Sequence, residues 1–276
     1  MHRPLMPALA LTALLFASAS RGLMAQTSPG YGGMPAPRTT DAATLRNLAI
    51  QREIRERFTL GLAALNRGDY SATISQFEAV LQRNPPEPQN STAHYNIALA
   101  LARSGNADRA ASELRSAIAR DPGFLAAYAN LVSLDLQRGD LKGAREAADK
   151  FLALAPESAR ALYSRGLTAL HSGDVATARA DFAKLLQKNP AYAPAHYDIA
   201  LVELKAGRVD VAERELEAAL SAAPDYPRAR FALGVVLLRE GHRDEARVAF
   251  EKVVHDAADP GLRNLAGSMR DTLATP

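Results

Sequence analysis

Apolar residues recur at helical spacing on both sides of a series of short glycine-containing stretches. The stretch LNRGDY around Gly68 returns with small changes as ARSGNA, LQRGDL, LHSGDV, LKAGRV and LREGHR. The apolar positions between these stretches follow the period of an α-helix and lack the strict alternation of strands. The pattern therefore predicts pairs of helices, each pair joined by a tight turn.

The turns keep a fixed spacing. Their glycines, separated by 37 residues once and then by 34 residues four times, are Gly68, Gly105, Gly139, Gly173, Gly207 and Gly241. Prolines repeat at the same intervals, at Pro85, Pro122, Pro156, Pro190 and Pro224. A glycine can end the first helix of a pair in the left-handed conformation, and a proline marks where the second helix has finished. The spacing predicts an array of repeated helical pairs.

Small residues stand where the two helices of a pair must approach closely. In the first helices they are Gly61, Ala98, Gly166, Ala200 and Gly234, and in the second helices Ala110, Ala144, Ala178, Ala212 and Ala246. We expect larger residues to fill the space between the helices, namely Phe77, Leu114, Phe182, Leu216 and Phe250.

This pattern resembles the tetratricopeptide repeat, a 34-residue unit with small residues at positions 8, 20 and 27, a Gly-Asp-Tyr-like turn at 15 to 17 and proline at 32. Six units can be aligned, 54–87, 91–124, 125–158, 159–192, 193–226 and 227–260. The resemblance implies an all-α fold, a right-handed α-solenoid of six helix-turn-helix repeats.

The units depart from the family pattern at a few positions. Thr73 replaces the second-helix alanine of the first unit, and an insertion around residues 87–89 follows that unit. Val132 and Phe151 occupy small positions of the third unit, and Ala258 stands where the sixth should have proline. We expect local irregularity there, especially around Val132 and Phe151, without a break in the array.

The flanking segments differ from the repeats. Residues 26–40 are rich in Pro and Gly and predict a flexible linker, and residues 41–53 predict an extension helix that runs into the first repeat. Residues 261–276 predict a capping helix and tail, because a terminal repeat exposes an apolar face. The apolar stripe of that helix is expected to contain Leu262, Leu265, Ala266, Met269 and Leu273.

Residues 1–25 have the layout of a secretory signal. A basic tip, His2-Arg3, precedes an apolar run from Leu5 to Ala17, which is too short to span about 30 Å of hydrocarbon. Cleavage is expected after Ala19 or Ala25; the alternative is an uncleaved N-terminal anchor. The sequence thus predicts a periplasmic or secreted protein without a transmembrane segment in the mature chain.

Composition narrows the function further. Without residues 1–25 the chain has 31 basic and 30 acidic residues, which is far from the charge of a nucleic-acid-binding protein. The absence of cysteine excludes disulfides and thiolate metal sites. Stability must therefore come from packing.

No constellation of catalytic residues is recognised. His242-Arg243-Asp244 spells a kinase tripeptide, but it lies in a predicted turn without the asparagine or the glycine-rich loop of that family. The histidines of the repeats lack metal-ligand spacing, and we assign His94 and His196, which share one repeat position, a structural role. Residues 90–92 form an N-glycosylation sequon, which matters only in a eukaryotic secretory pathway. We predict no enzymatic activity, no metal and no cofactor.

The family resemblance implies a partner-binding surface. In tetratricopeptide proteins the first helices line a concave groove, chiefly through positions 2, 5, 6, 9, 12 and 13 of each repeat. Carried over to this chain, the partner-binding residues are Phe58, Tyr95, Tyr163, Tyr197 and Phe231 at position 5, Asn96, Asn130 and Asp198 at position 6, Arg160 and Arg228 at position 2, and Arg103, Gln137, His171, Lys205 and Arg239 at position 13.

Such a groove suits an extended or helical peptide. Aromatic rings would supply contact area, amides would hold the peptide backbone, and cations would favour acidic side chains or a C-terminal carboxylate. The alternative is that these rings and cations only pack against neighbouring helices. The lysine that the family's chaperone-binding members carry at position 5 is absent, so docking of a cytosolic chaperone tail is not expected.

We predict a non-catalytic interaction adaptor or scaffold of the bacterial cell envelope that binds a protein or peptide. Two alternatives remain open. One is a self-associating scaffold that uses an end of the array or the 41–57 helix. The other is a module that binds a glycan or small ligand by stacking on Tyr163 or Tyr197.

Overall fold

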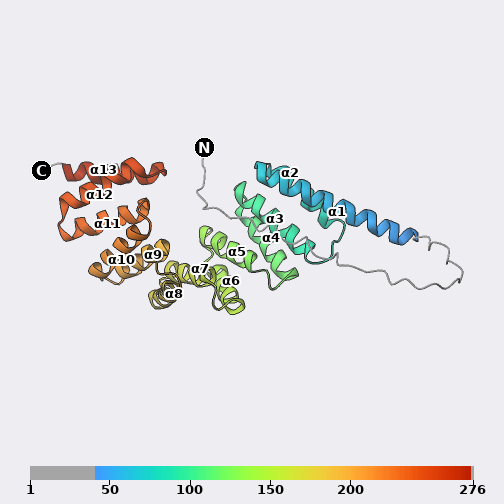
Figure 1. Ribbon diagram of the computed structural model, residues 1–276, viewed down its shortest axis with the longest axis horizontal. Coiled ribbons are helices and arrows are strands. Elements are labelled where there is room, and N and C mark those ends of the chain that lie inside the picture. The colour runs from blue at the N-terminus through green and yellow to red at the C-terminus, as the bar shows by residue number, and fades with distance from the viewer. Residues whose placement is uncertain (1–40, 275–276) are drawn as a thin grey trace, which may run out of the picture. The chain divides into compact units, whose positions relative to one another are not determined.

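The computed structural model describes residues 41–274, and the proposed signal and linker lie outside the described residues. The repeats lie in one compact unit, which begins at Arg46. The described residues form thirteen α-helices and no strands (Figure 1). The predicted all-α repeat fold is thereby confirmed.

The helices follow one another along the chain, and a glycine turn joins the two helices of each pair. They are α1 (Ala42–Arg67), α2 (Tyr70–Leu81), α3 (Gln89–Arg103), α4 (Ala107–Arg120), α5 (Leu125–Gln137), α6 (Leu141–Leu154), α7 (Ala159–His171), α8 (Val175–Lys188), α9 (Ala193–Lys205), α10 (Val209–Ala222), α11 (Pro227–Glu240), α12 (Arg243–Asp256) and α13 (Pro260–Ala274). Helix α1 contains both the predicted extension and the first helix of repeat 1. From α2 to α13, each helix contacts the next helix along the chain.

The glycine turns have the predicted geometry. All six turn glycines adopt a positive φ, between 73° and 90°. In the first turn, Gly68 and Asp69 donate backbone hydrogen bonds to Leu65 and Ala64, which ends α1 in the manner of a Schellman motif. The Asp69 carboxylate then accepts from the amide of Ala72, at 3.0 Å, and caps α2. Side chains also cap α4, α6 and α8 in this way, whereas Arg208 and His242 leave α10 and α12 without a side-chain cap.

Within each pair, the residue at position 8 is matched in volume to the residue at position 24. In repeats 1, 4 and 6 a glycine faces a fully buried phenylalanine, and a Cβ atom at Gly166 would lie only 2.6 Å from the Phe182 ring. In repeats 2 and 5 the same positions hold buried Ala98 with Leu114 and buried Ala200 with Leu216. The expectation that large residues fill the space left by small ones is confirmed.

Repeat 3 reverses this arrangement, and our expectation of irregularity there is wrong. Val132, 1% exposed, is large for position 8, but Ala148 at position 24 is small and fully buried. Phe151, at position 27, is 2% exposed and supplies the remaining volume. Helices α5 and α6 consequently run without interruption.

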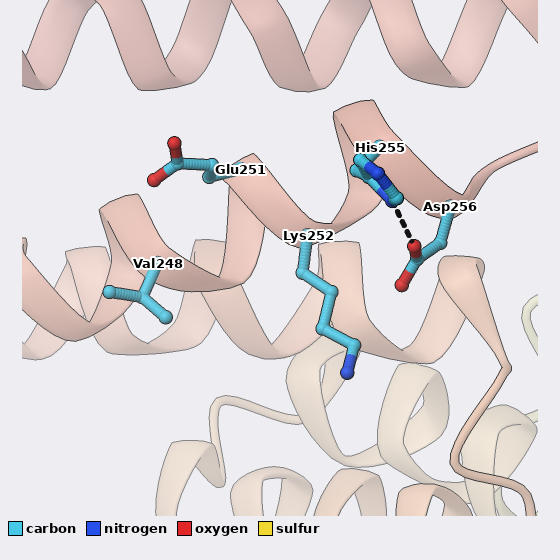
Figure 2. Close-up of a pocket in the computed structure, with 5 residues that line it drawn as sticks. All are labelled: Val248, Glu251, Lys252, His255 and Asp256. Atoms are coloured by element: carbon cyan, nitrogen blue, oxygen red, sulfur yellow. Dashed lines mark hydrogen bonds and ion pairs between the residues drawn. The ribbon is translucent and has the colours of Figure 1, made fainter.

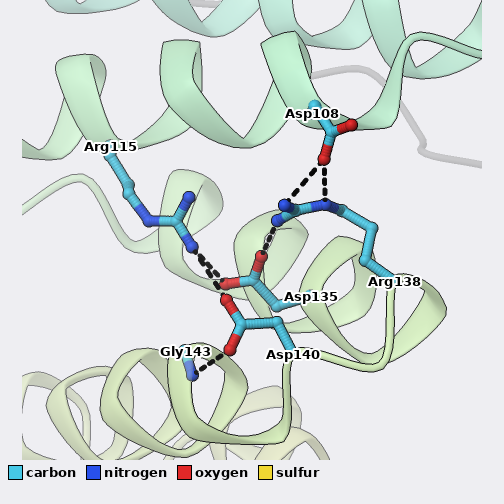
Figure 3. A network of polar contacts seen from close by, with 6 residues as sticks. All are labelled: Asp108, Arg115, Asp135, Arg138, Asp140 and Gly143. Atoms are coloured by element: carbon cyan, nitrogen blue, oxygen red, sulfur yellow. Dashed lines mark hydrogen bonds and ion pairs between the residues drawn. The ribbon is translucent and has the colours of Figure 1, made fainter.

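Buried carboxylates also join successive repeats. Asp135 on α5 is fully buried and accepts from Arg115 on α4 and from Arg138, each at 2.9 Å (Figure 3). Arg138 also pairs with Asp108 at 2.7 Å, and Asp140 caps α6 (Figure 3). Burial raises the pKa of Asp135, although both arginines act to lower it. Glu203 on α9 plays a similar part, held by Arg179 at 2.7 Å and by Arg208.

Helix α13 covers the end of the array. Ala266 is fully buried, and Leu262, Met269 and Leu273 pack against the core of repeat 6. Leu265, which we expected in the same stripe, is instead 51% exposed. The contacting residues recur at intervals of three and four, and Leu265 lies to one side of them on the helix.

Candidate partner-binding face

We use the name first-helix face for repeat positions 2, 5, 6, 9, 12 and 13 of the first helices, from residue 54 of α1 through α3, α5, α7, α9 and α11. Helix α7 contacts both α5 and α9, which are the first helices of the repeats before and after it. Side chains from different repeats therefore meet on this face.

The position 5 aromatics are half-buried, and each contacts another ring. Phe58 and Phe231 pack on Phe77 and Phe250, with ring centroids 5.2 and 5.4 Å apart. The three tyrosines at this position contact rings at position 34, with centroid distances of 4.9 Å for Tyr95–Phe124, 5.6 Å for Tyr163–Tyr192 and 5.4 Å for Tyr197–Tyr226. Repeat 3, with Ala129 and Ser158, interrupts the row. The rings thus serve packing and still present part of their surface.

Sequence reasoning missed the position 34 aromatics. Tyr192 and Tyr226 precede α9 and α11 and occupy the N-cap positions of those helices. Their 34-residue separation, like that of the turn glycines, was the available signal. Position 34 is not one of the groove positions of the family, so the family resemblance did not indicate these rings.

Hydrogen bonds join three polar side chains of this face, one each from repeats 2, 3 and 4. The Asn130 amide nitrogen donates to the Tyr95 hydroxyl at 2.9 Å, and Arg160 donates to the Asn130 carbonyl oxygen at 3.0 Å. Both polar atoms of the Asn130 side chain are therefore paired within the protein. We call Tyr95, Asn130 and Arg160 the closed triad.

The same three positions recur 68 residues later as Tyr163, Asp198 and Arg228. Asp198 is 5% exposed, and one of its carboxylate oxygens, Oδ2, is buried without a hydrogen-bond partner. No hydrogen bond or ion pair joins Arg228 to Asp198 among the described residues. Burial raises the pKa of Asp198 to about 7, against the lowering effects of Tyr163 and Arg228. We call this set the open triad.

The other predicted site residues differ in their availability. Asn96 is 6% exposed and donates to the backbone oxygen of Thr92 at 2.8 Å, so its amide nitrogen is already used. Lys205 is exposed and donates to the carbonyl of Leu170 at 3.1 Å, at the end of α7. The remaining position 13 side chains are exposed at the C-terminal ends of their helices, namely Arg103, Gln137, His171 and Arg239.

The first-helix face is strongly basic. It contains six cations, all exposed, and a single acid, the buried Asp198; the cations are Arg55, Arg103, Arg160, Lys205, Arg228 and Arg239. Four of the six have no side-chain hydrogen bond or ion pair within the described part of the chain. A chain whose formal net charge is only +3 therefore concentrates free positive charge on this face.

The histidines assigned a structural role have partners that the sequence search did not identify. His94 and His196 each contact a glutamate on the following helix, Glu113 at 2.7 Å and Glu215 at 2.6 Å. Both contacts join repeat positions 4 and 23 and hold the two helices of one repeat together. Over residues 41–274 no group of three or more His, Cys, Asp or Glu side chains is arranged to hold a metal ion.

Two hollows lie away from the first-helix face. One, of about 400 Å³, is an open depression along α12 lined by Val248, Glu251, Lys252, His255 and Asp256 (Figure 2). The other, of about 150 Å³, lies among Arg145, Arg165, Asp149, Asp174 and neighbouring residues, where opposite charges balance. Asn90 of the sequon is only 5% exposed, so the folded chain does not present it for glycosylation.

The uninterrupted series of helical pairs and the shared face define an all-α repeat protein of the α-solenoid class. Profiles of the tetratricopeptide repeat match residues 58–123, 130–193 and 197–262, and a further tetratricopeptide repeat profile matches 169–220. Because these matches cover more than half of its residues, the chain belongs to the tetratricopeptide repeat family. Proteins of this family bind peptides or proteins and are generally non-catalytic adaptors.

Solved structures of the family are similar to this chain. MamA is 26% identical, with 61% of this chain and 92% of MamA covered at a TM-score of 0.52. A tetratricopeptide repeat protein from Parabacteroides merdae and pilF from Pseudomonas aeruginosa are each 18% identical, with TM-scores of 0.59 and 0.62. These two cover 81% and 80% of this chain and 100% and 99% of their own, and their likeness shows the fold. None of the curated proteins compared with the chain matches its sequence.

No helix in residues 41–274 combines the length and the hydropathy that a membrane span requires.

Proposed function

We propose that this chain is a non-catalytic adaptor of the bacterial cell envelope whose first-helix face binds an acidic segment of a partner protein. The observation that carries the proposal is the charge of this face, with six exposed cations against one buried acid. Cations that lack partners within the chain can pair with carboxylates of a partner and steer its approach.

Apolar side chains between the cations support the same proposal. Position 9 contributes Leu62 and Val235, which are 40% and 38% exposed, and half-buried Leu99, Leu167 and Leu201. A segment with both acidic and apolar residues would bury these aliphatic surfaces while its carboxylates meet the cations. The half-buried tyrosines add rigid contact area.

The test is a pair of variants with equal charge change. In the face variant, Arg103, Lys205 and Arg239 are replaced by Gln; in the control, exposed Lys142, Lys150 and Arg247 of the second helices are replaced by Gln. Both variants and the parent are used for affinity capture from a native envelope extract, followed by crosslinking and mass spectrometry.

The expected result is a partner that the parent and the control hold and the face variant loses, crosslinked through an acidic segment. Equal loss in both variants would show that overall charge governs capture. Retention by both would place binding elsewhere on the chain. Either result contradicts the proposal.

We propose the envelope location from the N-terminal sequence, since His2-Arg3, the apolar run and the small residues up to Ala19 have the layout of an export signal. Fractionation of cells followed by N-terminal mass analysis tests this proposal. The mature protein is expected in the exported fraction, beginning at Ser20 or Gln26. An intact chain in the cytosol would contradict the assignment.

Self-association is the second candidate, and exposed leucines on α1 favour it. Leu48 and Leu60 are 58% and 56% exposed on the helix that starts the array. Sedimentation over a concentration range separates the two functions, because a chain that stays monomeric at micromolar concentration is not an obligate self-assembling scaffold.

A further inference from the structure

The open triad leaves an ionisable group unsatisfied in the middle of the first-helix face. The Asp198 Oδ2 atom is buried and has no hydrogen-bond partner. Native proteins pair the large majority of buried polar atoms, so such an oxygen needs an explanation. In the closed triad the corresponding side-chain oxygen has a hydrogen-bond donor, because Arg160 donates to the Asn130 side-chain oxygen.

Four tyrosines lie close enough to this carboxylate to interact electrostatically with it. They form two ring pairs, Tyr163–Tyr192 at 5.6 Å and an interplanar angle of 82°, and Tyr197–Tyr226 at 5.4 Å and 53°. The charge of Asp198 acts on all four hydroxyl groups and, with burial as the larger cause, raises their pKa values. The rings are half-buried, so the cluster reaches the surface of the face.

We propose that Asp198, with Tyr163, Tyr192, Tyr197 and Tyr226, forms a subsite for one lysine or arginine side chain of the bound partner segment. This inference rests on the proposed function, because it places a single basic residue within the otherwise acidic segment.

The chemistry of the cluster favours a cation over a neutral donor. An ionised carboxylate only accepts hydrogen bonds, and charged donors form the stronger ones. Tyrosine rings attract positive charge to their faces, and a lysine or arginine stem can pack along them. A neutral amide or hydroxyl would satisfy Oδ2 without these further interactions.

The protonation of Asp198 gives the subsite a dependence on pH. Burial raises its pKa to about 7, so a cation binds the ionised form and binding strengthens as pH rises from 6 to 8. The groups that face Asp198 are Tyr163 from α7, Tyr192 and Tyr226 from the segments before α9 and α11, Tyr197 from α9, and Arg228 from α11. The four tyrosines, whose pKa values are raised, stay neutral over this range.

The test uses N-acetyl-lysine methylamide as the probe and N-acetyl-norleucine methylamide as its uncharged control. The full chain with isotope-labelled tyrosine rings is titrated with each compound while the ring signals are followed by NMR. We expect a saturable change at the four tyrosines of the cluster with the lysine probe, weaker binding of the norleucine control, and no change at Tyr95 of the closed triad.

Variants identify the group that is responsible. Asp198→Asn keeps the shape and removes the charge, and is expected to weaken the lysine probe by about tenfold or more. Arg228→Gln removes a nearby cation that competes for Asp198, so this variant is expected to bind the lysine probe more strongly than the parent does. Equal binding of the lysine probe to the parent and to Asp198→Asn, or no saturable change at any ring of the cluster, would overturn the subsite.

These results are separable from the proposed function. One outcome is capture of an acidic partner that depends on Arg103, Lys205 and Arg239, with no NMR change at the four tyrosines when the lysine probe is added. This outcome would support the proposed function and refute the subsite. The opposite outcome is a saturable NMR change at these tyrosines with the lysine probe but no captured partner. It would support the cation subsite and refute the adaptor proposal.

Discussion

The closed and open triads occupy the same repeat positions, 68 residues apart, and yet they differ in one chemical respect. Asn130 offers both a donor and an acceptor, so it can bridge the Tyr95 hydroxyl and the Arg160 guanidinium. Asp198 offers only acceptors when ionised, and its second oxygen remains without a donor. One amide in place of a carboxylate therefore separates a structural bridge from a candidate binding group.

The comparison of the two triads depends on the alignment of the repeats, and the largest expected effect comes from testing that alignment. Ala178 is fully buried where α7 and α8 approach each other, so Ala178→Glu would place an unpaired carboxylate between them. We expect a loss of at least about 3 kcal/mol of unfolding free energy. Ala180→Glu, on the exposed side of the same helix, should change stability by less than about 0.5 kcal/mol in thermal or denaturant unfolding. Similar stability of the two variants would refute the alignment of the repeats.

Asp198→Asn should convert the open triad into a copy of the closed one. Because the folded pKa, about 7, lies above 3.8, the ordinary pKa of an aspartate, the folded state binds more protons than the unfolded state between these values. Stability conferred by this site is therefore highest below pH 4 and falls as pH rises to about 7. At about 1.4 kcal/mol per pKa unit, the substitution should stabilise the chain by up to about 4 kcal/mol at pH 8.

Denaturant unfolding at several pH values checks this prediction. At pH 4 the parent and Asp198→Asn should have nearly equal stability, and the difference should grow toward pH 8. A difference that is independent of pH would mean that Asp198 is not the group responsible.

The closed triad should be weakened by loss of its bridge. Asn130→Ala removes two hydrogen bonds across three helices, and at about 1 kcal/mol for each bond we expect a loss of about 2 kcal/mol. Gln137→Ala, at an exposed position of the same helix, serves as the control in the same unfolding measurement. An effect of Asn130→Ala no larger than the control would show that the bridge contributes nothing to stability.

The smallest expected difference is between the two arginines. Arg160→Ala removes a hydrogen bond from an exposed side chain and should cost about 1 kcal/mol, whereas Arg228→Ala removes none and should change stability by less than about 0.5 kcal/mol. Parallel urea unfolding of both variants at pH 8 would sharpen the comparison. Equal losses would place Arg228 in a contact like that of Arg160.

The sequence was sufficient for the repeats because their signals are periodic. Gly68 and its five counterparts marked the turns, and the pairing of Gly166 with Phe182 followed from volume. It was insufficient for Val132, because compensation by Ala148 and Phe151 depends on how three side chains share one space. Periodicity indicates which face a residue occupies, but it does not indicate which neighbour supplies the missing volume.

The candidate face was predicted in outline, and its chemistry was not. Position numbers placed Asn96, Asn130 and Asp198 on the same face. They did not reveal that Asn96 bonds within its own helix, or that Asn130 bonds to groups 35 and 30 residues away. Hydrogen-bond partners between repeats depend on three-dimensional distances, and burial of a single carboxylate depends on rings such as Tyr226 that lie outside the family's groove positions.

The matched volumes at positions 8 and 24 constrain how genes for such arrays can recombine. A crossover within a glycine turn joins the first helix of one repeat to the second helix of another. The Gly166 helix joined to the Leu216 helix would leave a void, and the Val132 helix joined to the Phe250 helix would be overfilled. A crossover between repeats keeps each pair intact, so whole repeats are the units that duplication can add or remove without repacking the core.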